Sequence, residues 1–292
     1  MKYFLLFTAK LLLIAFLILG VLDVIYTQVY KQSSSRNKIA YVYNSKARDY
    51  DVVILGSSRA NNHFVASLFE EKGLKTFNYG MSGGHLFEAS LLLKLMVARH
   101  YTIKNVILEA DLNLANDKES ESVASKFMPY IHDSKTIEAH FEQQPHFWVN
   151  YYIPFYRYII FEPEIGFREM YNTAKGKGTK LLDNLGYYPL GKNPKANMKN
   201  DLTNLKPLHN KYYKEIKQIC KVNNIKLIAV MTPMCSNTKG LDYFQKVHQI
   251  YPEIHNYEDV IQGDQYFSSC GHLNDAGARL FTNRILKDFF KK

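Results

Sequence analysis

Cysteine, tryptophan and the usual metal-binding patterns are scarce or missing in this chain of 292 residues. Its three cysteines, Cys220, Cys235 and Cys270, are far apart, which argues against a disulfide framework and against a CxxC metal site. One bridge with one free thiol remains compatible with an oxidising compartment. The sequence has no HExxH or paired-histidine spacing and no glycine-rich dinucleotide fingerprint, so we expect no metal and no organic cofactor.

The patterns of nucleic-acid-binding proteins are missing too, although the net charge is +10. The lysines are spread along the chain, and there is no zinc-finger spacing, basic helix or RNA-binding aromatic signature. We therefore expect no nucleic-acid partner. The basic surface is either simply solvated or faces an acidic envelope polymer or lipid headgroups.

Charge is almost absent from residues 3–26, whose only charged side chains are Lys10 and Asp23. About twenty apolar residues are enough to cross a bilayer as a helix. No small-residue cleavage site follows the run, so an uncleaved anchor is favoured over a removed signal peptide. We predict a single-pass membrane anchor at residues 1–28 and a polar linker at residues 29–49.

From residue 50 onward, apolar runs of strand length alternate with helical patterns. Strands are predicted at residues 52–55, 75–79, 105–110, 226–231 and 254–257, and helices at residues 63–72, 85–100, 207–223, 241–251 and 274–290. This alternation predicts an α/β domain over residues 50–292, in which a mostly parallel sheet carries helices on both faces. Residues 116–205 interrupt this alternation of strands and helices and are predicted as a partly helical insertion that lies over the sheet edge.

Ligands of such a sheet bind beyond the carboxyl ends of its strands. Predicted strands end at Gly56–Arg59, Gly80–Gly84, Asp111–Asn113 and Thr232–Pro233, and His272 follows a later loop. A serine on a tight turn after a buried strand, together with a histidine at the start of the last helix, is the pair that nucleophilic acyl transfer needs. We therefore expect these loops to form one site.

Two motifs of the chain, Gly56-Ser57-Ser58-Arg59 and Gly271-His272-Leu273-Asn274, resemble the SGNH/GDSL hydrolase superfamily. The resemblance covers roughly residues 52–112 and 226–290. The chain resembles in particular the membrane-anchored branch of this superfamily, which includes envelope-polymer O-acyltransferases and esterases. The resemblance implies a flavodoxin-like SGNH fold, that is, a three-layer α/β/α arrangement, preceded by one transmembrane helix.

The resemblance also implies roles for individual residues. Ser58 aligns with the nucleophile, and His272 aligns with the base that takes its proton. Gly80 aligns with a glycine whose backbone N–H, with that of Ser58, holds the oxyanion, although a turn that needs positive φ explains a glycine equally well. Arg59 either binds an anionic substrate or forms a structural pair. Ser57 is a rival nucleophile, and either serine is also a natural helix cap.

Two departures from the family pattern affect the expected chemistry. Glu109-Ala110-Asp111 stands where the family has Gly-x-Asn, and an ionised Asp111 cannot donate a hydrogen bond, so the oxyanion donor would be a protonated acid or Asn113. Ser269 stands three positions before His272, where the family has the aspartate that orients the imidazole. The open substitutes for that aspartate are a backbone carbonyl or a carboxylate from Asp111, Asp259 or Asp264.

The expected function is that of a serine-dependent O-acyl esterase or transferase, with acetyl as the favoured group. Its substrate would be an envelope polysaccharide or another acylated glycan, and a membrane protein is a candidate acyl donor. The two departures favour an alternative, a catalytically degenerate binding or assembly protein of the same fold. Cys270, close to His272, is expected to be a small packed residue and not a thiol nucleophile.

Two arguments about the side of the membrane conflict. Lys31, Arg36 and Lys38 follow the predicted span, while Lys2 and the terminal amine precede it, and this bias would place the main domain in the cytoplasm. The family resemblance implies an extracytoplasmic domain. A cytoplasmic hydrolase of lipid esters is therefore a third expectation.

Overall fold

The computed structural model describes residues 1–193 and 197–291 and divides the chain into two compact units. Unit 1 consists of Met1–Asn44 and Glu121–Gly178, and unit 2 consists of Ser45–Ser120 and Thr179–Lys292. Most of the predicted insertion, residues 116–205, thus belongs to the same unit as the predicted anchor. Its residues 194–196 and the terminal Lys292 lie outside the described part of the chain.

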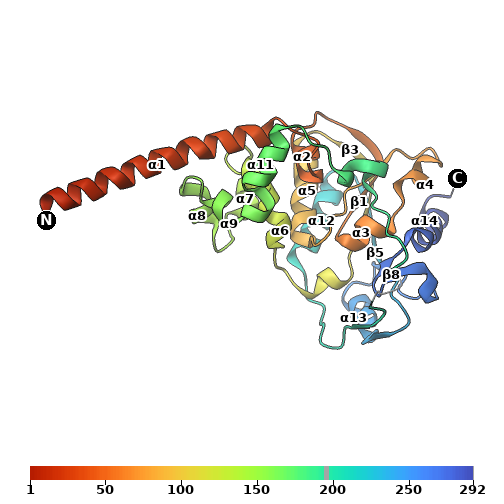
Figure 1. Cartoon of the computed structure of the whole chain (residues 1–292). Helices are drawn as coiled ribbons and strands as arrows, with labels where there is room; N and C mark the ends of the chain where they lie inside the picture. Colours follow the sequence, from red (N-terminus) through yellow and green to blue (C-terminus); the bar gives the residue numbers. More distant parts are fainter. Residues whose placement is uncertain (194–196, 292) are drawn as a thin grey trace. The chain divides into compact units, whose positions relative to one another are not determined.

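Unit 2 is built on five parallel strands in the order β2-β1-β3-β5-β7 (Figure 1). The strands are β1 (Asp49–Leu55), β2 (Thr76–Asn78), β3 (Thr102–Glu109), β5 (Lys226–Met231) and β7 (His255–Asn256). The apolar runs 52–55 and 106–108 are completely buried, as is usual for central strands of a parallel sheet. The predicted α/β class and mostly parallel sheet are confirmed.

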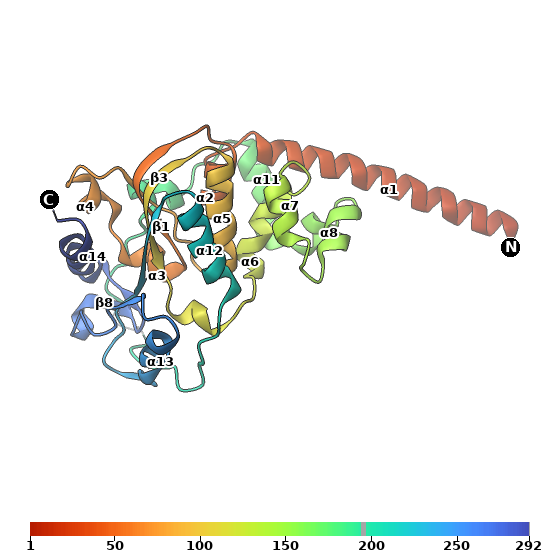
Figure 2. The same ribbon diagram turned by 180° about the vertical axis from the view of Figure 1, so that it is seen from behind.

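The helices of unit 2 lie on both sides of this sheet. Helices α5 and α12 pack together on one side, and α14 packs against α3 on the other (Figures 1 and 2). The helices are α3 (Ser58–His63), α4 (Ala66–Glu70), α5 (Leu86–Ala98), α12 (Lys211–Val222), α13 (Asp242–Ile250) and α14 (Asp275–Phe289), with 3-10 helices η1 (Leu112–Ala115), η3 (Lys180–Gly186) and η4 (Asp264–Tyr266).

The single helix predicted at residues 63–72 is wrong. The chain forms α3 and α4 instead, separated by extended backbone at Phe64 and Val65. Thr282 of α14 holds this break, because its hydroxyl accepts from the Val65 N–H at 2.9 Å and donates to the His63 carbonyl at 3.2 Å. A contact from the far end of the chain therefore overrides the local helical pattern.

Two small sheets complete unit 2. In the first, β4 (Asn200–Asp201) pairs in parallel with β6 (Thr238–Lys239). In the second, β8 (Phe267–Ser269) pairs antiparallel with β9 (His272–Leu273). Because β9 begins at His272, this hairpin determines where the imidazole lies.

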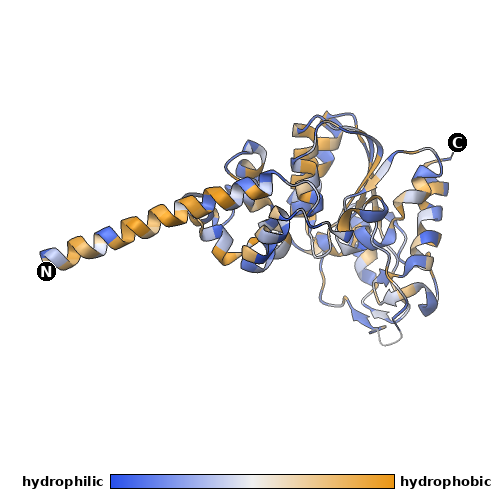
Figure 3. Cartoon of the chain, turned by 45° about the horizontal axis from the view of Figure 1, so that its top comes forward, coloured by the Kyte–Doolittle hydropathy of each residue, from blue (hydrophilic) through white to orange (hydrophobic). Residues whose placement is uncertain are grey.

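Unit 1 is entirely helical within the described residues. Its elements are α1 (Lys2–Lys31), α2 (Lys38–Tyr43), α6 (Glu121–Ala124), η2 (Ser125–Tyr130), α7 (Lys135–Phe141), α8 (Phe147–Tyr152), α9 (Tyr156–Ile160), α10 (Glu162–Ile165) and α11 (Phe167–Ala174). Only α1 among the described helices is long and apolar enough to cross a membrane, with a mean hydropathy of 2.7 over an 18-residue window that has no buried residue. Figure 3 shows hydrophobic residues along most of α1.

The last turns of α1 form part of the core of unit 1. Tyr26 and Tyr30 are buried there, and the Tyr30 hydroxyl donates to the Ile165 carbonyl at 2.9 Å. The residues that follow, predicted as a polar linker at 29–49, contain α2 and contacts with the rest of the unit. An example is the ion pair of Arg36 with Glu169 at 2.7 Å.

Candidate functional site

The turn after β1 places two serines at the carboxyl edge of the sheet. Gly56 begins it with φ of 139°, and a Cβ there would lie 2.6 Å from Oε2 of Glu109. Both the backbone conformation and the lack of space require glycine. The strand order reverses between β1 and β3, which is where open α/β sheets usually bind ligands.

Ser58 and His272 are brought together at this edge. Ser58 Oγ lies 2.8 Å from His272 Nε2, although 214 positions separate the two residues. Ser58 is the first residue of α3, and His272 is the first residue of β9. A hydroxyl within hydrogen-bond reach of an imidazole is the geometry of an activated nucleophile and its base.

The second imidazole nitrogen of His272 faces Ser269. The distance from Nδ1 to the Ser269 hydroxyl is 3.4 Å, a long hydrogen bond that suits the tautomer in which Nδ1 carries the proton. Within the described residues, no hydrogen bond joins His272 to Asp111, Asp259 or Asp264. The side-chain partner of His272 Nδ1 in the described structure is therefore the Ser269 hydroxyl.

The charge state of His272 suits a base. Burial lowers its pKa below the usual 6.5, and the Arg59 cation lowers the pKa further, while Asp111 acts in the opposite direction. The neutral imidazole, which can accept a proton, therefore predominates at neutral pH.

Ser57 is held in a structural role. Its hydroxyl accepts from the Arg59 N–H at 3.2 Å and caps α3. Its own N–H donates to Oε2 of Glu109 at 2.7 Å. Because these bonds fix Ser57 as the helix cap, the geometry favours Ser58 over Ser57 as the nucleophile.

Arg59 is also turned away from solvent. Only 3 % of this residue is exposed. Its Nε donates to the Thr232 hydroxyl at 2.8 Å, and Nη2 donates to the carbonyls of Thr232 and Pro233 at 2.6 and 3.1 Å. The guanidinium is thus bound to the loop after β5, which favours the structural pairing over an anionic substrate.

Asp111 completes this buried ion pair. Its Oδ2 lies 3.3 Å from Arg59 Nη2 and accepts from both the N–H and the hydroxyl of Thr232 at 3.1 Å. Burial alone would raise the pKa of Asp111, but Arg59 and the hydrogen bonds outweigh burial and lower it. An ionised, completely buried Asp111 cannot donate to an oxyanion or contact substrate, so that expectation is corrected.

Glu109 has the opposite charge state. It is completely buried, and burial raises its pKa well above 4.5, with a further increase from the neighbouring Asp111. Burial thus favours the protonated, neutral form of Glu109, whose Oε2 accepts from the Ser57 N–H at 2.7 Å. No sequence motif assigned Glu109 a role, although an acid at the end of a buried strand is an unusual position that marks it.

Gly80 does not have the geometry expected from the family pattern. Its N–H donates to Oδ1 of Asn78 at 2.9 Å and is not available to an oxyanion in this conformation. Its φ is not positive, so the turn explanation is wrong as well. Glycine is needed because a Cβ would clash with the Asn61 backbone nitrogen in α3.

Two other groups remain available as oxyanion donors. The Ser58 N–H, at the start of α3, makes no hydrogen bond within the described residues, as is usual for the first turn of a helix. Asn113 lies in η1 directly after β3 and is 9 % exposed. Its side-chain amide has no partner within the described part of the chain, whereas its carbonyl accepts from Asn210 at 3.3 Å.

His63 is a residue of this region that the sequence did not reveal. It is completely buried, and its Nε2 accepts from the Leu273 N–H at 3.1 Å. Burial lowers the pKa of His63 well below 6.5, and the nearby Arg59 and His272 lower it further. A neutral His63 therefore ties the last residue of α3 to β9, directly beside His272.

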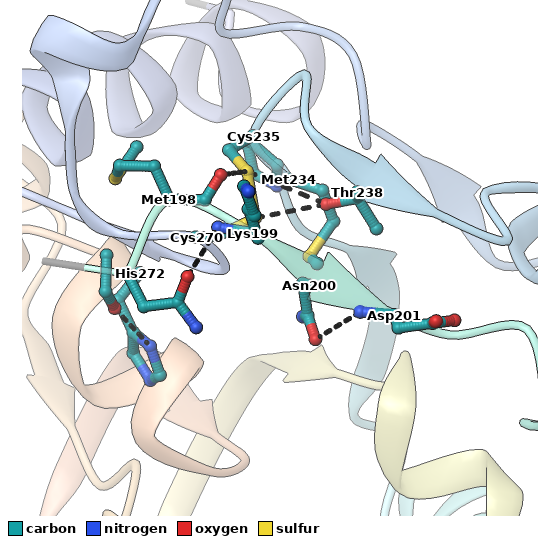
Figure 4. The surroundings of a disulfide bond; sticks show 12 residues. Met198, Lys199, Asn200, Asp201, Met234, Cys235, Thr238, Cys270 and His272 are labelled. Carbon is teal, nitrogen blue, oxygen red and sulfur yellow. Dashed lines mark hydrogen bonds between the residues drawn. A yellow bond between two sulfur atoms is a disulfide. The ribbon is translucent and has the colours of Figure 1, made fainter.

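A disulfide joins Cys235 to Cys270 (Figure 4). Cys220 is a free buried thiol. The bridge links the loop after β5 to the turn of the β8–β9 hairpin, two residues before His272. Cys270 is thus bonded, which corrects the expectation of a merely packed residue. Burial raises the pKa of the Cys220 thiol to about 12, which makes it a poor nucleophile.

Within the described residues, no group of three or more His, Cys, Asp or Glu side chains is placed to hold a metal ion. No model of a known protein family matches the chain, and no curated protein matches it.

Proposed function

We propose that unit 2 is a domain of the SGNH type that catalyses transfer or hydrolysis of an O-acyl group, with Ser58 as nucleophile and His272 as base. The observation that carries the proposal is the 2.8 Å contact between Ser58 Oγ and His272 Nε2. The strand order of the central sheet supports it, because it is that of flavodoxin-like doubly wound folds.

The chemistry follows from the two side chains. Ser58 Oγ attacks the carbonyl carbon of the ester while its proton passes to His272 Nε2. The tetrahedral intermediate collapses to an acyl-serine, and His272 returns the proton to the departing alkoxide. Water or a second hydroxyl then attacks the acyl-serine, which gives a free acid or a new ester and restores Ser58.

The oxyanion would be held by the Ser58 N–H and the Asn113 side-chain amide. Both are donors without a partner in the described structure, and both follow central strands at the same sheet edge. Donors that are already positioned stabilise the negative charge that develops in the transition state.

We further propose that α1 anchors the chain in a membrane, with unit 2 on the extracytoplasmic side and an acetylated envelope glycan as substrate. The disulfide between Cys235 and Cys270 supports this side, because disulfides persist in oxidising compartments. The substrate itself rests on the motif resemblance.

The second candidate is a binding or assembly protein of the same fold that has lost catalysis. Two observations favour it. Ser269 gives His272 only a 3.4 Å hydrogen bond where a carboxylate would be stronger, and the Gly80 N–H is occupied by Asn78.

The experiment is labelling of the full chain in detergent micelles with a fluorophosphonate serine probe. We expect labelling of the wild type and of Ser57→Ala, and no labelling of Ser58→Ala or His272→Ala. Ser57→Ala is the matched control because it removes a neighbouring hydroxyl and leaves the Ser58–His272 pair intact. A folded wild type that does not react would favour the binding protein.

A further inference from the structure

An aromatic segment of unit 1, residues 147–161, carries exposed apolar side chains without exposed charge. The segment covers α8 and α9 and has one charged residue, Arg157, which is only 1 % exposed. Its exposed large apolar residues are Trp148, Tyr152, Ile153, Ile159 and Ile160, each at least 46 % accessible. A surface facing water over such a length would normally include charged residues.

The segment is fixed to the end of the apolar part of α1. Asp23 binds it twice, because its carboxylate accepts from the Phe155 N–H at 2.7 Å and from Arg157 Nη2 at 2.6 Å. The rings of Tyr26 and Phe155 pack edge to face with centroids 4.8 Å apart. These contacts place the segment at one defined level along α1.

That level coincides with the end of the predicted span. The twenty residues from Phe4 to Asp23 form about 30 Å of helix, which is the thickness of the hydrocarbon core of a bilayer. Asp23 therefore lies where the span would leave the hydrocarbon. Figures 1 and 2 both show α8 nearer than α11 to the N-terminal end of α1.

The residue types fit the boundary between lipid and water. The rings of Trp148 and Tyr152 are exposed and stack with centroids 5.3 Å apart. Tryptophan and tyrosine are enriched at this boundary, where an apolar ring and a polar atom are both accommodated. Short amphipathic helices can lie in the same plane with their apolar side chains in the upper acyl region.

We propose that residues 147–161 lie in the membrane interface, with Trp148, Tyr152, Ile153, Ile159 and Ile160 in contact with lipid. The inference rests on the proposed membrane anchorage of α1 and is independent of the chemistry at Ser58. Its consequence is that the chain holds unit 1 against the bilayer by two elements, the span and this segment.

Trp148 is the single tryptophan of the chain, which makes a direct test possible. The full chain is reconstituted into phosphatidylcholine vesicles, and the fluorescence of Trp148 is measured with lipids brominated near the headgroup or near the end of the acyl chain. We expect strong quenching by the shallow bromine, weaker quenching by the deep bromine, and poor quenching by iodide in the buffer.

Two matched proteins separate this inference from the anchorage. Trp148→Phe with Leu13→Trp reports on the span and is expected to be quenched by the deep bromine. Trp148→Phe with Val222→Trp carries a tryptophan at an exposed position of unit 2, 67 % accessible in the wild type, and is expected to respond to iodide alone.

The outcomes are distinct. Lipid quenching of the Leu13→Trp protein, without lipid quenching of Trp148 in the wild type, would overturn the interface proposal and leave the anchor. A Trp148 signal protected from iodide but insensitive to both bromines would overturn it too, because a protein partner or a second copy would then cover the segment instead of lipid. Absence of lipid quenching in all three proteins would overturn the interface and the anchor together.

Discussion

Arg59 Nη2 lies 3.3 Å from Asp111 Oδ2, and both side chains are buried behind the turn that carries Ser58. The pair joins the three segments that follow β1, β3 and β5, because Thr232 binds both partners. A buried ion pair adds little net stability compared with apolar side chains of similar size. The main effect of this pair is therefore to hold the three segments in position. Removal of one partner is different, because it leaves a buried charge without compensation.

We therefore predict that Asp111→Asn lowers the free energy of unfolding by about 3–5 kcal/mol. Urea unfolding of the full chain in micelles, followed by circular dichroism, measures this loss. Asp242→Asn is the control, because Asp242 forms an exposed pair with Lys246 four residues away on α13, and we expect no measurable change there. An equal effect of the two variants would contradict the role of the buried pair.

The raised pKa of Glu109 predicts a stabilising substitution. The unfolded chain releases the Glu109 proton near pH 4.5, whereas the folded chain retains it well above that pH. Between these two pKa values the folded state holds more protons, so the stability of the wild type falls as the pH rises. Glu109→Gln has no proton to release at this position, so this cause of falling stability is removed. Its side-chain oxygen still accepts from the Ser57 N–H.

We expect Glu109→Gln to match the wild type near pH 4 and to be increasingly more stable than it from pH 5 to pH 8. Urea midpoints across this range provide the measurement, and Ser58 labelling shows that the turn is intact. Glu109→Ala is the contrasting variant, because it leaves the Ser57 N–H without its buried partner and should lower stability at every pH. A Gln variant that loses stability relative to the wild type as pH rises would mean that Glu109 is ionised.

The long contact between Ser269 and His272 predicts a gain of function. An aspartate at position 269 would face Nδ1 of His272 and stabilise the imidazolium that forms during the reaction. We expect Ser269→Asp to increase the rate of fluorophosphonate labelling about tenfold or more, in line with the usual contribution of such groups. Ser268→Asp is the control, because within the described residues the hydrogen bond to Nδ1 of His272 comes from Ser269 and none joins Ser268 to His272.

The pH dependence gives an independent readout for the same variant. In the wild type, burial and Arg59 lower the pKa of His272, so labelling should fall only when the pH drops below 6.5. A carboxylate beside Nδ1 favours the charged imidazole and so raises the pKa of His272. In Ser269→Asp the loss of labelling at acidic pH should therefore begin at a higher pH. If neither the labelling rate nor the pH at which labelling falls changes, the side chain at position 269 does not act on His272.

The sequence was sufficient for the sheet and for the pairing of the two motifs. Buried parallel strands such as β5 (Lys226–Met231) contain an uninterrupted apolar run, here residues 227–231, and such runs are recognisable locally. Ser58 and His272 could be paired because Ser58 directly follows a predicted strand and His272 lies in the loop before the last predicted helix, and such loops meet at the carboxyl edge of a parallel sheet. These inferences depend on local pattern and on topology alone.

The remaining features depend on contacts between distant residues. Thr282 breaks the helix predicted at residues 63–72, and Asn78 occupies the N–H of Gly80. His63 supports β9 across 210 positions of the chain. A sequence contains the groups that can make such bonds but does not state which of them meet, so neither the break nor the occupied N–H was predictable.

The disulfide allows a test of the cysteine pairing and of the side of the membrane on which unit 2 lies. Cys235–Cys270 closes a loop with a sequence separation of 35 next to His272, whereas Cys220 is free and buried. We predict that iodoacetamide modifies one cysteine, Cys220, when the full chain isolated from cells is denatured without reductant, and all three after reduction. Mass spectrometry of peptides identifies the modified residues. Three modified cysteines without reductant would show a reduced chain and would argue against an extracytoplasmic unit 2.

The same bridge should matter for the position of the base. Cys235→Ala combined with Cys270→Ala removes a link that is worth about 3–5 kcal/mol for a loop of this size. Because Cys270 lies two residues before His272, we also expect slower labelling of Ser58 in the protein that remains folded. Cys220→Ala serves as the control and should label at the wild-type rate, since Cys220 lies on α12 and takes no part in the hairpin. Loss of stability without any change in labelling would limit the disulfide to a role in folding.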